Sequence, residues 1–140
     1  MIAAKKIAEV MGLGRRVHSL SDLSAAVAHG LPKAALRAVV TRVIADPRDR
    51  NGILYRIVPE ATYKRRKDLL KPEESARTER LARVVATAEY VWDDREDAHA
   101  FLTASHPELG NRRPVDVALT ELGARRVEDL LWKLFHGLAA

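Results

Sequence analysis

The stretch from residue 92 to residue 137 constrains most strongly how this chain can fold. Apolar residues recur in it at intervals of three and four, which is the spacing of one face of an α-helix. In its last segment these residues are Val127, Leu130, Leu131, Leu134 and Phe135. Residues that favour helix starts and tight turns separate the periodic segments, namely Asp93-Asp94, Leu109-Gly110-Asn111, Pro114 and Thr120. The stretch therefore predicts three short helices joined by sharp turns, with Gly137 as a helix stop.

The rest of the chain also follows a helical pattern. The predicted helices cover residues 3–11, residues from a cap at Ser19 or Ser21 to Gly30, residues 32–44 and, as the longest, residues 73–92. The polar run at 47–52 predicts a loop. Residues 53–58 are rich in β-branched side chains, but without a second strand to pair with they favour a short helix. A basic helix is predicted over 59–70. The predicted fold class is all-α.

Composition supports helix packing and excludes several kinds of site. Hydrophobic residues make up 47% of the chain, enough for a buried core, while aromatic residues make up only 5%. The chain has no cysteine, so it has no disulfide, thiolate nucleophile or zinc–cysteine site. No apolar leader is visible in the first ten residues, and no run has the length of a membrane span. A cytoplasmic location is expected.

Charge divides the chain into two unlike halves. Residues 1–70 hold 14 Lys/Arg and 6 Asp/Glu, a net charge of +8, whereas residues 71–140 hold 10 and 13, a net charge of −3. Two surfaces with different partners are the simplest interpretation, one for phosphate and one for protein.

A helix-turn-helix can be placed in two ways in the basic half. The first placement uses Ala26, Gly30, Leu36 and Val39, but plain helix packing explains this pattern equally well. The second takes residues 52–57 as a positioning helix and 59–69 as a recognition helix. Its candidate DNA-binding residues are Thr62, Tyr63, Lys64, Arg65, Arg66 and Lys67. The alternative for this run is a basic face that only meets solvent.

The sequence contains no pattern of residues that is typical of a catalytic site or a metal site. The five histidines form no metal-binding motif, and the paired acids, such as Glu73-Glu74, are neighbours that do not converge on one face of a helix. No phosphate-binding glycine loop or nucleophile elbow is present. We therefore predict a protein that is not an enzyme and that has no metal or cofactor.

The C-terminal end carries the remaining signal. Trp132 and Phe135 belong either to the core or to an interface, where aromatic residues commonly anchor a partner. The apolar residues Leu138, Ala139 and Ala140 follow the predicted stop at Gly137. They are either a frayed end or a tail that enters a partner's cleft.

These features, taken in order, resemble the Xre/MbcA/ParS antitoxins, which are partners of RES-domain toxins. The C-terminal residues that carry the resemblance are Phe101-Leu102, Leu109-Gly110-Asn111, Pro114, Thr120 with Gly123, Val127, Leu131 and Gly137. Upstream, they are Thr62 to Lys67, Leu70, Glu74-Ser75 and Arg80-Leu81. The resemblance covers residues 20–138. Phe101 stands where the family usually has Trp, Asn111 where it usually has Gly, and segment 46–58 departs from a standard helix-turn-helix.

The resemblance implies a two-part antitoxin. Residues 1–71 would form an Xre-like DNA-binding domain that represses its own operon, and residues 72–140 a toxin-binding domain, with helix 73–92 shared. The toxin would be an NAD-consuming RES-domain protein, neutralised by occlusion of its NAD cleft. The implied toxin-binding residues are Trp132, Phe135, His136, Gly137, Leu138, Ala139, Ala140, Arg112 and Arg113. Operator DNA and a homodimer or a larger toxin–antitoxin assembly are also implied. The alternative is a transcription regulator whose C-terminal half only dimerises.

Overall fold

The computed structural model describes residues 1–137, and its regular elements there are all helical. They are α1 (Ala4–Val10), α2 (Leu20–His29), α3 (Lys33–Val43), α4 (Pro47–Ile57), α5 (Glu60–Arg65), α6 (Pro72–Trp92), α7 (Arg95–Thr103), the 3-10 helix η1 (Pro107–Leu109), α8 (Pro114–Val117) and α9 (Glu121–Gly137). The predicted all-α fold class is confirmed. Among the described residues, no helix is both long and apolar enough to cross a membrane.

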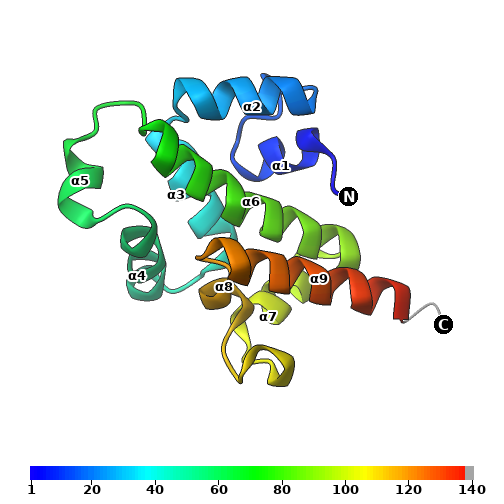
Figure 1. The fold of residues 1–140 in the computed structure, drawn as a ribbon. Helices are drawn as coiled ribbons and strands as arrows, with labels where there is room; N and C mark the ends of the chain where they lie inside the picture. The colour runs from blue at the N-terminus through cyan, green and yellow to red at the C-terminus, as the bar shows by residue number, and fades with distance from the viewer. Residues whose placement is uncertain (138–140) are drawn as a thin grey trace.

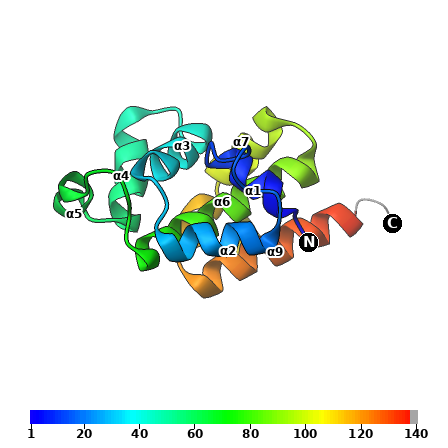
Figure 2. The same cartoon turned by 90° about the horizontal axis from the view of Figure 1, so that it is seen from above.

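Helix α6 is the centre of the fold. Its 21 residues run through the middle of the molecule, and α1, α2, α3, α4, α7 and α9 pack against it (Figures 1 and 2). Between Leu81 and Glu89 every residue except Arg83 is buried, so this part of the helix is covered on all sides. Glu89 is buried as a carboxylate because Arg42 of α3 donates two hydrogen bonds to it, at 2.6 and 2.8 Å. The two halves of the chain therefore pack around one common core, and no flexible linker separates them.

Several helices begin where the sequence indicates. The hydroxyl groups of Ser19 and Thr120 accept hydrogen bonds from the backbone N–H three residues on, at 3.1 and 3.0 Å, and the carboxylate of Asp94 does so at 2.9 Å. Pro72 and Pro114 occupy the first turn of α6 and α8, where a proline needs no hydrogen-bond partner. The predicted cap at Thr120 is confirmed, and of the alternatives left open by the sequence the caps are Ser19 rather than Ser21 and Asp94 of the Asp93-Asp94 pair.

The loop predicted over residues 47–52 is wrong, because α4 starts at Pro47. The carboxylate of Asp46 caps this helix by accepting a hydrogen bond from the backbone N–H of Asp49 at 2.9 Å. Gly52 costs a helix interior about 1 kcal/mol. Burial of the apolar face outweighs that cost, since each fully buried aliphatic side chain contributes about 1.5–3 kcal/mol. The buried residues are Ile53, Leu54 and Ile57.

The helix predicted over residues 59–70 is too long, because α5 ends at Arg65. Beyond it the chain is extended and pairs with the segment before α3. The carbonyl of Asp68 accepts a hydrogen bond from the N–H of Lys33 at 2.9 Å, and the N–H of Leu70 donates to the carbonyl of Leu31 at 2.8 Å. These backbone groups have partners outside a helix, and Pro72 then starts α6.

The contact between α8 and α9 is unusually close at Gly123. A Cβ atom at this position would lie 1.8 Å from the carbonyl oxygen of Val117. Only glycine allows the start of α9 to approach the end of α8 this closely.

Candidate functional surfaces

Helix α9 ends on the side of the molecule where the N-terminus also lies (Figure 1), and its last turns carry most of an aromatic cluster. We use this name for Tyr90 of α6 together with Trp132, Phe135 and His136 of α9. The ring centroids of Tyr90, Trp132 and Phe135 lie 5.7 Å from one another, and the ring of His136 lies 5.2 Å from that of Phe135. These are contact distances for interacting aromatic rings.

The aromatic cluster is partly open to solvent. Tyr90 is 51% exposed and Phe135 is 38% exposed. Together with Met1, Ile2, Ala3 and Lys6, the cluster lines a hollow of about 550 Å³. Exposed aromatic side chains next to an apolar hollow are typical of protein-binding surfaces.

Sequence reasoning finds three members of this cluster and misses the fourth. Trp132, Phe135 and His136 are predicted from the sequence, while Tyr90 comes from α6 and meets them across more than 40 residues of chain. A single tyrosine between Glu89 and Val91 gives no signal in the sequence. Gly137, also predicted, is still helical at the end of α9. Leu138, Ala139 and Ala140 lie outside the described residues.

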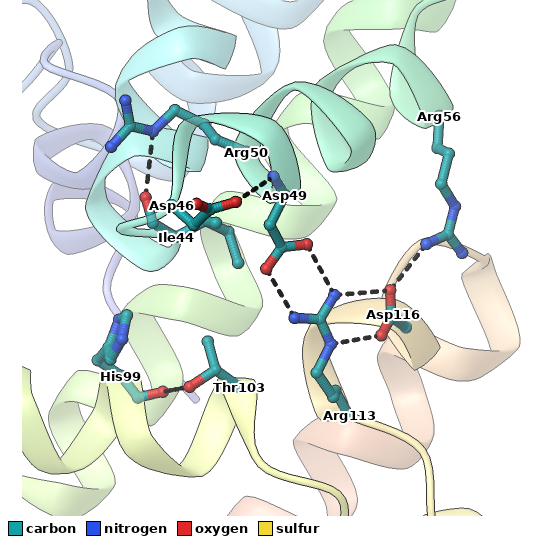
Figure 3. A network of polar contacts seen from close by, with 9 residues as sticks. All are labelled: Ile44, Asp46, Asp49, Arg50, Arg56, His99, Thr103, Arg113 and Asp116. Atoms are coloured by element: carbon teal, nitrogen blue, oxygen red, sulfur yellow. Dashed lines mark hydrogen bonds and ion pairs between the residues drawn. The ribbon is translucent and has the colours of Figure 1, made fainter.

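Arg113 lies away from this cluster and joins α8 to α4 instead (Figure 3). Its guanidinium donates hydrogen bonds of 2.8 and 3.1 Å to Asp49 on α4, and of 2.7 and 3.3 Å to Asp116 on α8. Asp116 also accepts a bond of 2.7 Å from Arg56 of α4. The four residues form an alternating chain of charges between the two halves of the molecule. The neighbouring Arg112 is exposed.

The Arg113 network shifts the titration of its members. The hydrogen bonds that Arg113 donates to Asp49, and next those to Asp116, raise the pKa of the guanidinium. The hydrogen bond from Arg113 lowers the pKa of Asp49. Burial raises the pKa of Asp116, but the hydrogen bonds from Arg113 and Arg56 outweigh burial, so that this pKa also lies below its usual range. The network therefore holds both carboxylates ionised.

Replacing Arg113 by alanine should lower the free energy of unfolding at neutral pH by about 1–2 kcal/mol, since two partly buried carboxylates lose a charged donor. A depressed carboxyl pKa stabilises the fold above the unfolded value near 3.9, and this stabilisation is lost as pH falls through the folded value. The difference between wild type and R113A should therefore shrink below about pH 4. Urea unfolding at several pH values measures it.

Arg112→Ala is the matched control, because it removes the adjacent arginine, which has no ion pair within residues 1–137. We expect a change within about 0.5 kcal/mol for this variant. Equal losses for the two variants, or a difference that does not depend on pH, would contradict the role of the network.

A basic surface covers α5 and the segment that follows it. Of the predicted DNA-binding residues, Thr62, Tyr63, Lys64 and Arg65 lie on α5, while Arg66 and Lys67 lie beyond its end. Tyr63 is 6% exposed and donates a hydrogen bond of 3.2 Å to the carbonyl of Lys33, so it belongs to the core. Arg66 donates two hydrogen bonds to Glu74, at 3.0 and 2.9 Å. Lys64 pairs with Glu60 on the surface. Arg65 and Lys67 are exposed without an ion pair in the described chain.

The structure contains both helix pairs in which the sequence allows a helix-turn-helix to be placed. Helices α4 and α5 are joined by a turn at Val58 and Pro59, and α2 and α3 by the segment from Gly30 to Pro32. Gly30 adopts φ +111°, and a Cβ there would lie 2.5 Å from the carbonyl oxygen of Leu70. Leu36 and Val39 are completely buried, and Ala26 packs against the same core.

Two known protein families match the chain, one in each half. Residues 22–83 match the family described as the antitoxin Xre-like helix-turn-helix domain, and residues 87–137 match the antitoxin Xre/MbcA/ParS C-terminal toxin-binding domain. The molecule is thus an antitoxin that combines a helix-turn-helix with a toxin-binding domain. The chain belongs to the Xre/MbcA/ParS-type antitoxins. No curated protein matches it.

Each of the two candidate surfaces lies within one of the two family matches. The α4–α5 pair lies in the helix-turn-helix match, and α9 with the whole aromatic cluster lies in the toxin-binding match. Families of these two kinds are typically non-enzymatic. Within residues 1–137, no group of three or more histidine or acidic side chains could hold a metal ion.

Proposed function

We propose that this antitoxin neutralises a cognate RES-domain, NAD-consuming toxin in the cytoplasm by closing the toxin's NAD cleft. The observation that carries the proposal is the exposed aromatic cluster at the end of α9. The sequence resemblance points to a RES-domain partner, and the family match indicates toxin binding in general.

The chemistry of the cluster suits inhibition by occupancy. Tyr90, Trp132 and Phe135 together offer a large apolar area, and such side chains dominate the energy of protein interfaces. The apolar sequence 138–140 continues the chain directly beyond this cluster, so the cluster would dock and the tail would enter the cleft. No bond is made or broken in this mechanism, and one antitoxin would silence one toxin.

The direct test first asks whether a neighbouring reading frame encodes a RES-domain protein, and then uses that protein as the cognate toxin. Co-expression should yield a complex that co-purifies, and adding the antitoxin to the isolated toxin should abolish NAD consumption at an equimolar ratio. A RES-domain protein that neither binds the chain nor loses activity would rule the proposal out. If the chain were instead a dimer that Phe135→Ala dissociates, the C-terminal half would serve dimerisation.

Removing residues 138–140 should weaken inhibition of NAD consumption by about tenfold or more, which corresponds to about 1.4 kcal/mol of binding energy. The fold should stay intact, because the last buried residue of α9 is Leu131. Thermal unfolding checks the fold, and the inhibition constant checks the tail. Unchanged inhibition would move the blocking element from the tail to the aromatic cluster itself.

We also infer that α4 and α5 bind operator DNA, so that the antitoxin represses its own operon, as a homodimer or in a larger complex with toxin. The helix-turn-helix match and the net charge of +8 in residues 1–70 support this, as do Arg65 and Lys67, which form no ion pair within residues 1–137. Binding to the duplex upstream of the reading frame should exceed binding to a scrambled duplex and fall steeply with salt. Equal affinity for the two duplexes would rule out operator recognition.

A further inference from the structure

The first 21 residues lie outside both family matches, yet their helix α1 packs against the core of the protein. Ile7, Ala8 and Val10 of α1 are buried, and α1 packs against α3 and α6. The segment contains four Lys/Arg and, before Asp22, a single acid, Glu9, so its net charge is +3. Its charged residues belong to a segment whose helix packs against the core, and neither family match includes them.

The cations of this segment adjoin α3 through two neighbouring hollows. The first, of about 740 Å³, is lined by Lys5, Arg15, Arg16 and His18 among others. The second, of about 520 Å³, lies between α1 and α3 and includes Arg37. Both hollows are lined in part by Glu9 and Gly12, so they adjoin each other, and Glu9 is the one acid in their linings. We call residues 12–18 the basic loop.

Arg37 connects these hollows to the helix-turn-helix. Its guanidinium lies 5.7 Å from the ring centroid of Tyr63 on α5, and Lys33 lies 4.4 Å from the same ring. In both views of the molecule α3 stands between α5 and α1 (Figures 1 and 2). Arg37, which is exposed on α3, therefore lies between the cations of α5 and those of the basic loop.

Four cations on this path have no partner in the described part of the chain, whereas Arg42, which also lines the second hollow, is bound to Glu89. Within residues 1–137, none of Lys5, Arg15, Arg16 and Arg37 forms an ion pair or a side-chain hydrogen bond. By comparison, several cations of the C-terminal half are bound to carboxylates, namely Arg80, Arg83, Arg113 and Lys133. A cation without a carboxylate partner is free to neutralise a phosphate and release its counterion.

We propose that the basic loop, together with Lys5 and Arg37, is a second DNA-binding surface that contacts the phosphate backbone beside the site of α5. A row of separate cations suits a polyanion with regularly spaced charges better than one small anion. Such contacts position a protein on the duplex and add affinity without reading sequence. The inference rests on the proposed binding of DNA by α4 and α5.

The experiment compares wild type with R15A/R16A, with R65A/K67A and with a control, R125A/R126A. The control removes two adjacent exposed arginines from α9, so the change in net charge is the same. Affinities for the operator duplex and for a scrambled duplex are measured by fluorescence anisotropy between about 50 and 200 mM salt. Circular dichroism melts confirm that each variant folds.

For R15A/R16A we expect the slope of log affinity against log salt to fall by about 2, with equal loss for the operator and the scrambled duplex. R65A/K67A should also lower the preference for operator, and R125A/R126A should leave the slope within about 0.5 of wild type. If the salt slope of R15A/R16A equals that of R125A/R126A while wild type still prefers the operator duplex, the inference fails and the proposed function stands. If wild type shows no preference for operator, the proposed function fails first, and with it the inference. Loss of operator binding alone in R15A/R16A would indicate base contacts and would also overturn the phosphate assignment.

Discussion

Replacing Gly123 by alanine should lower the free energy of unfolding by about 3 kcal/mol, the largest change in stability that we expect from a single methyl group in this chain. The new Cβ would lie 1.8 Å from the carbonyl oxygen of Val117 and 2.8 Å from the hydroxyl of Thr120, which caps the same helix. Backbone atoms cannot move aside as a flexible side chain can. The start of α9 would have to shift away from α8, and the aromatic cluster carried by α9 would shift with it.

Gly52→Ala provides the matched control, because Gly52 also lies within a helix but a Cβ atom added there would have no neighbouring atom within 4 Å. Here the substitution should raise the stability by about 0.5–1 kcal/mol, since alanine loses less backbone entropy than glycine on forming a helix. Urea unfolding followed by circular dichroism measures both variants. Effects of the same sign at the two glycines would contradict the close contact between α8 and α9.

Replacing Phe135 by alanine should weaken binding of the RES-domain toxin by about 30-fold, the loss of about 2 kcal/mol that is usual for an aromatic anchor of an interface. Phe135 contacts the rings of both Tyr90 and Trp132, and its 38% exposure leaves it available to a partner. The same exposure means that the fold should depend little on it. Titration calorimetry with the purified toxin gives the affinity, and a thermal melt gives the stability.

Leu122→Ala is the control for this experiment. Leu122 is 69% exposed and lies at the opposite end of α9 from the aromatic cluster, so its removal takes a comparable apolar surface from the same helix. Its effect on toxin affinity should stay within about threefold. If Leu122→Ala weakened binding as much as Phe135→Ala, the interface would lie along the whole of α9 rather than at its end.

Local signals predict the helix starts well, and they fail where burial decides the outcome. Ser19, Asp94 and Thr120 act on their own next turn, so the sequence alone predicts them. Residues 47–52 contain proline, asparagine and glycine, which favour a loop, but they form α4 because the residues that follow are buried against the core. The early end of α5 depends on backbone pairing with residues 31–33, which local sequence does not show.

In the candidate sites, too, contacts between residues close in sequence can be predicted, whereas contacts made by packing of distant segments cannot. Trp132, Phe135 and His136 lie within about one helical turn of one another, so their proximity can be predicted from spacing. Tyr90 cannot be predicted as their neighbour, because helix packing brings it there. The ion pair of Arg113 with Asp49 spans 64 residues, and no local pattern indicates which of two adjacent arginines points toward α4. Tyr63 lies on the predicted helix, but its side chain faces α3.

The two family matches end and begin at residues 83 and 87, inside the continuous helix α6. A protease that cut α6 would therefore break the core of both halves in one event. Under the proposed function, the toxin would be released and the operon derepressed together, with no lasting fragment able to perform either task alone. For the same reason, we expect that neither half would fold by itself if the gene were divided at the match boundary. The antitoxin would be inactivated as a unit, and its rate of degradation would determine both the release of toxin and the expression of the operon.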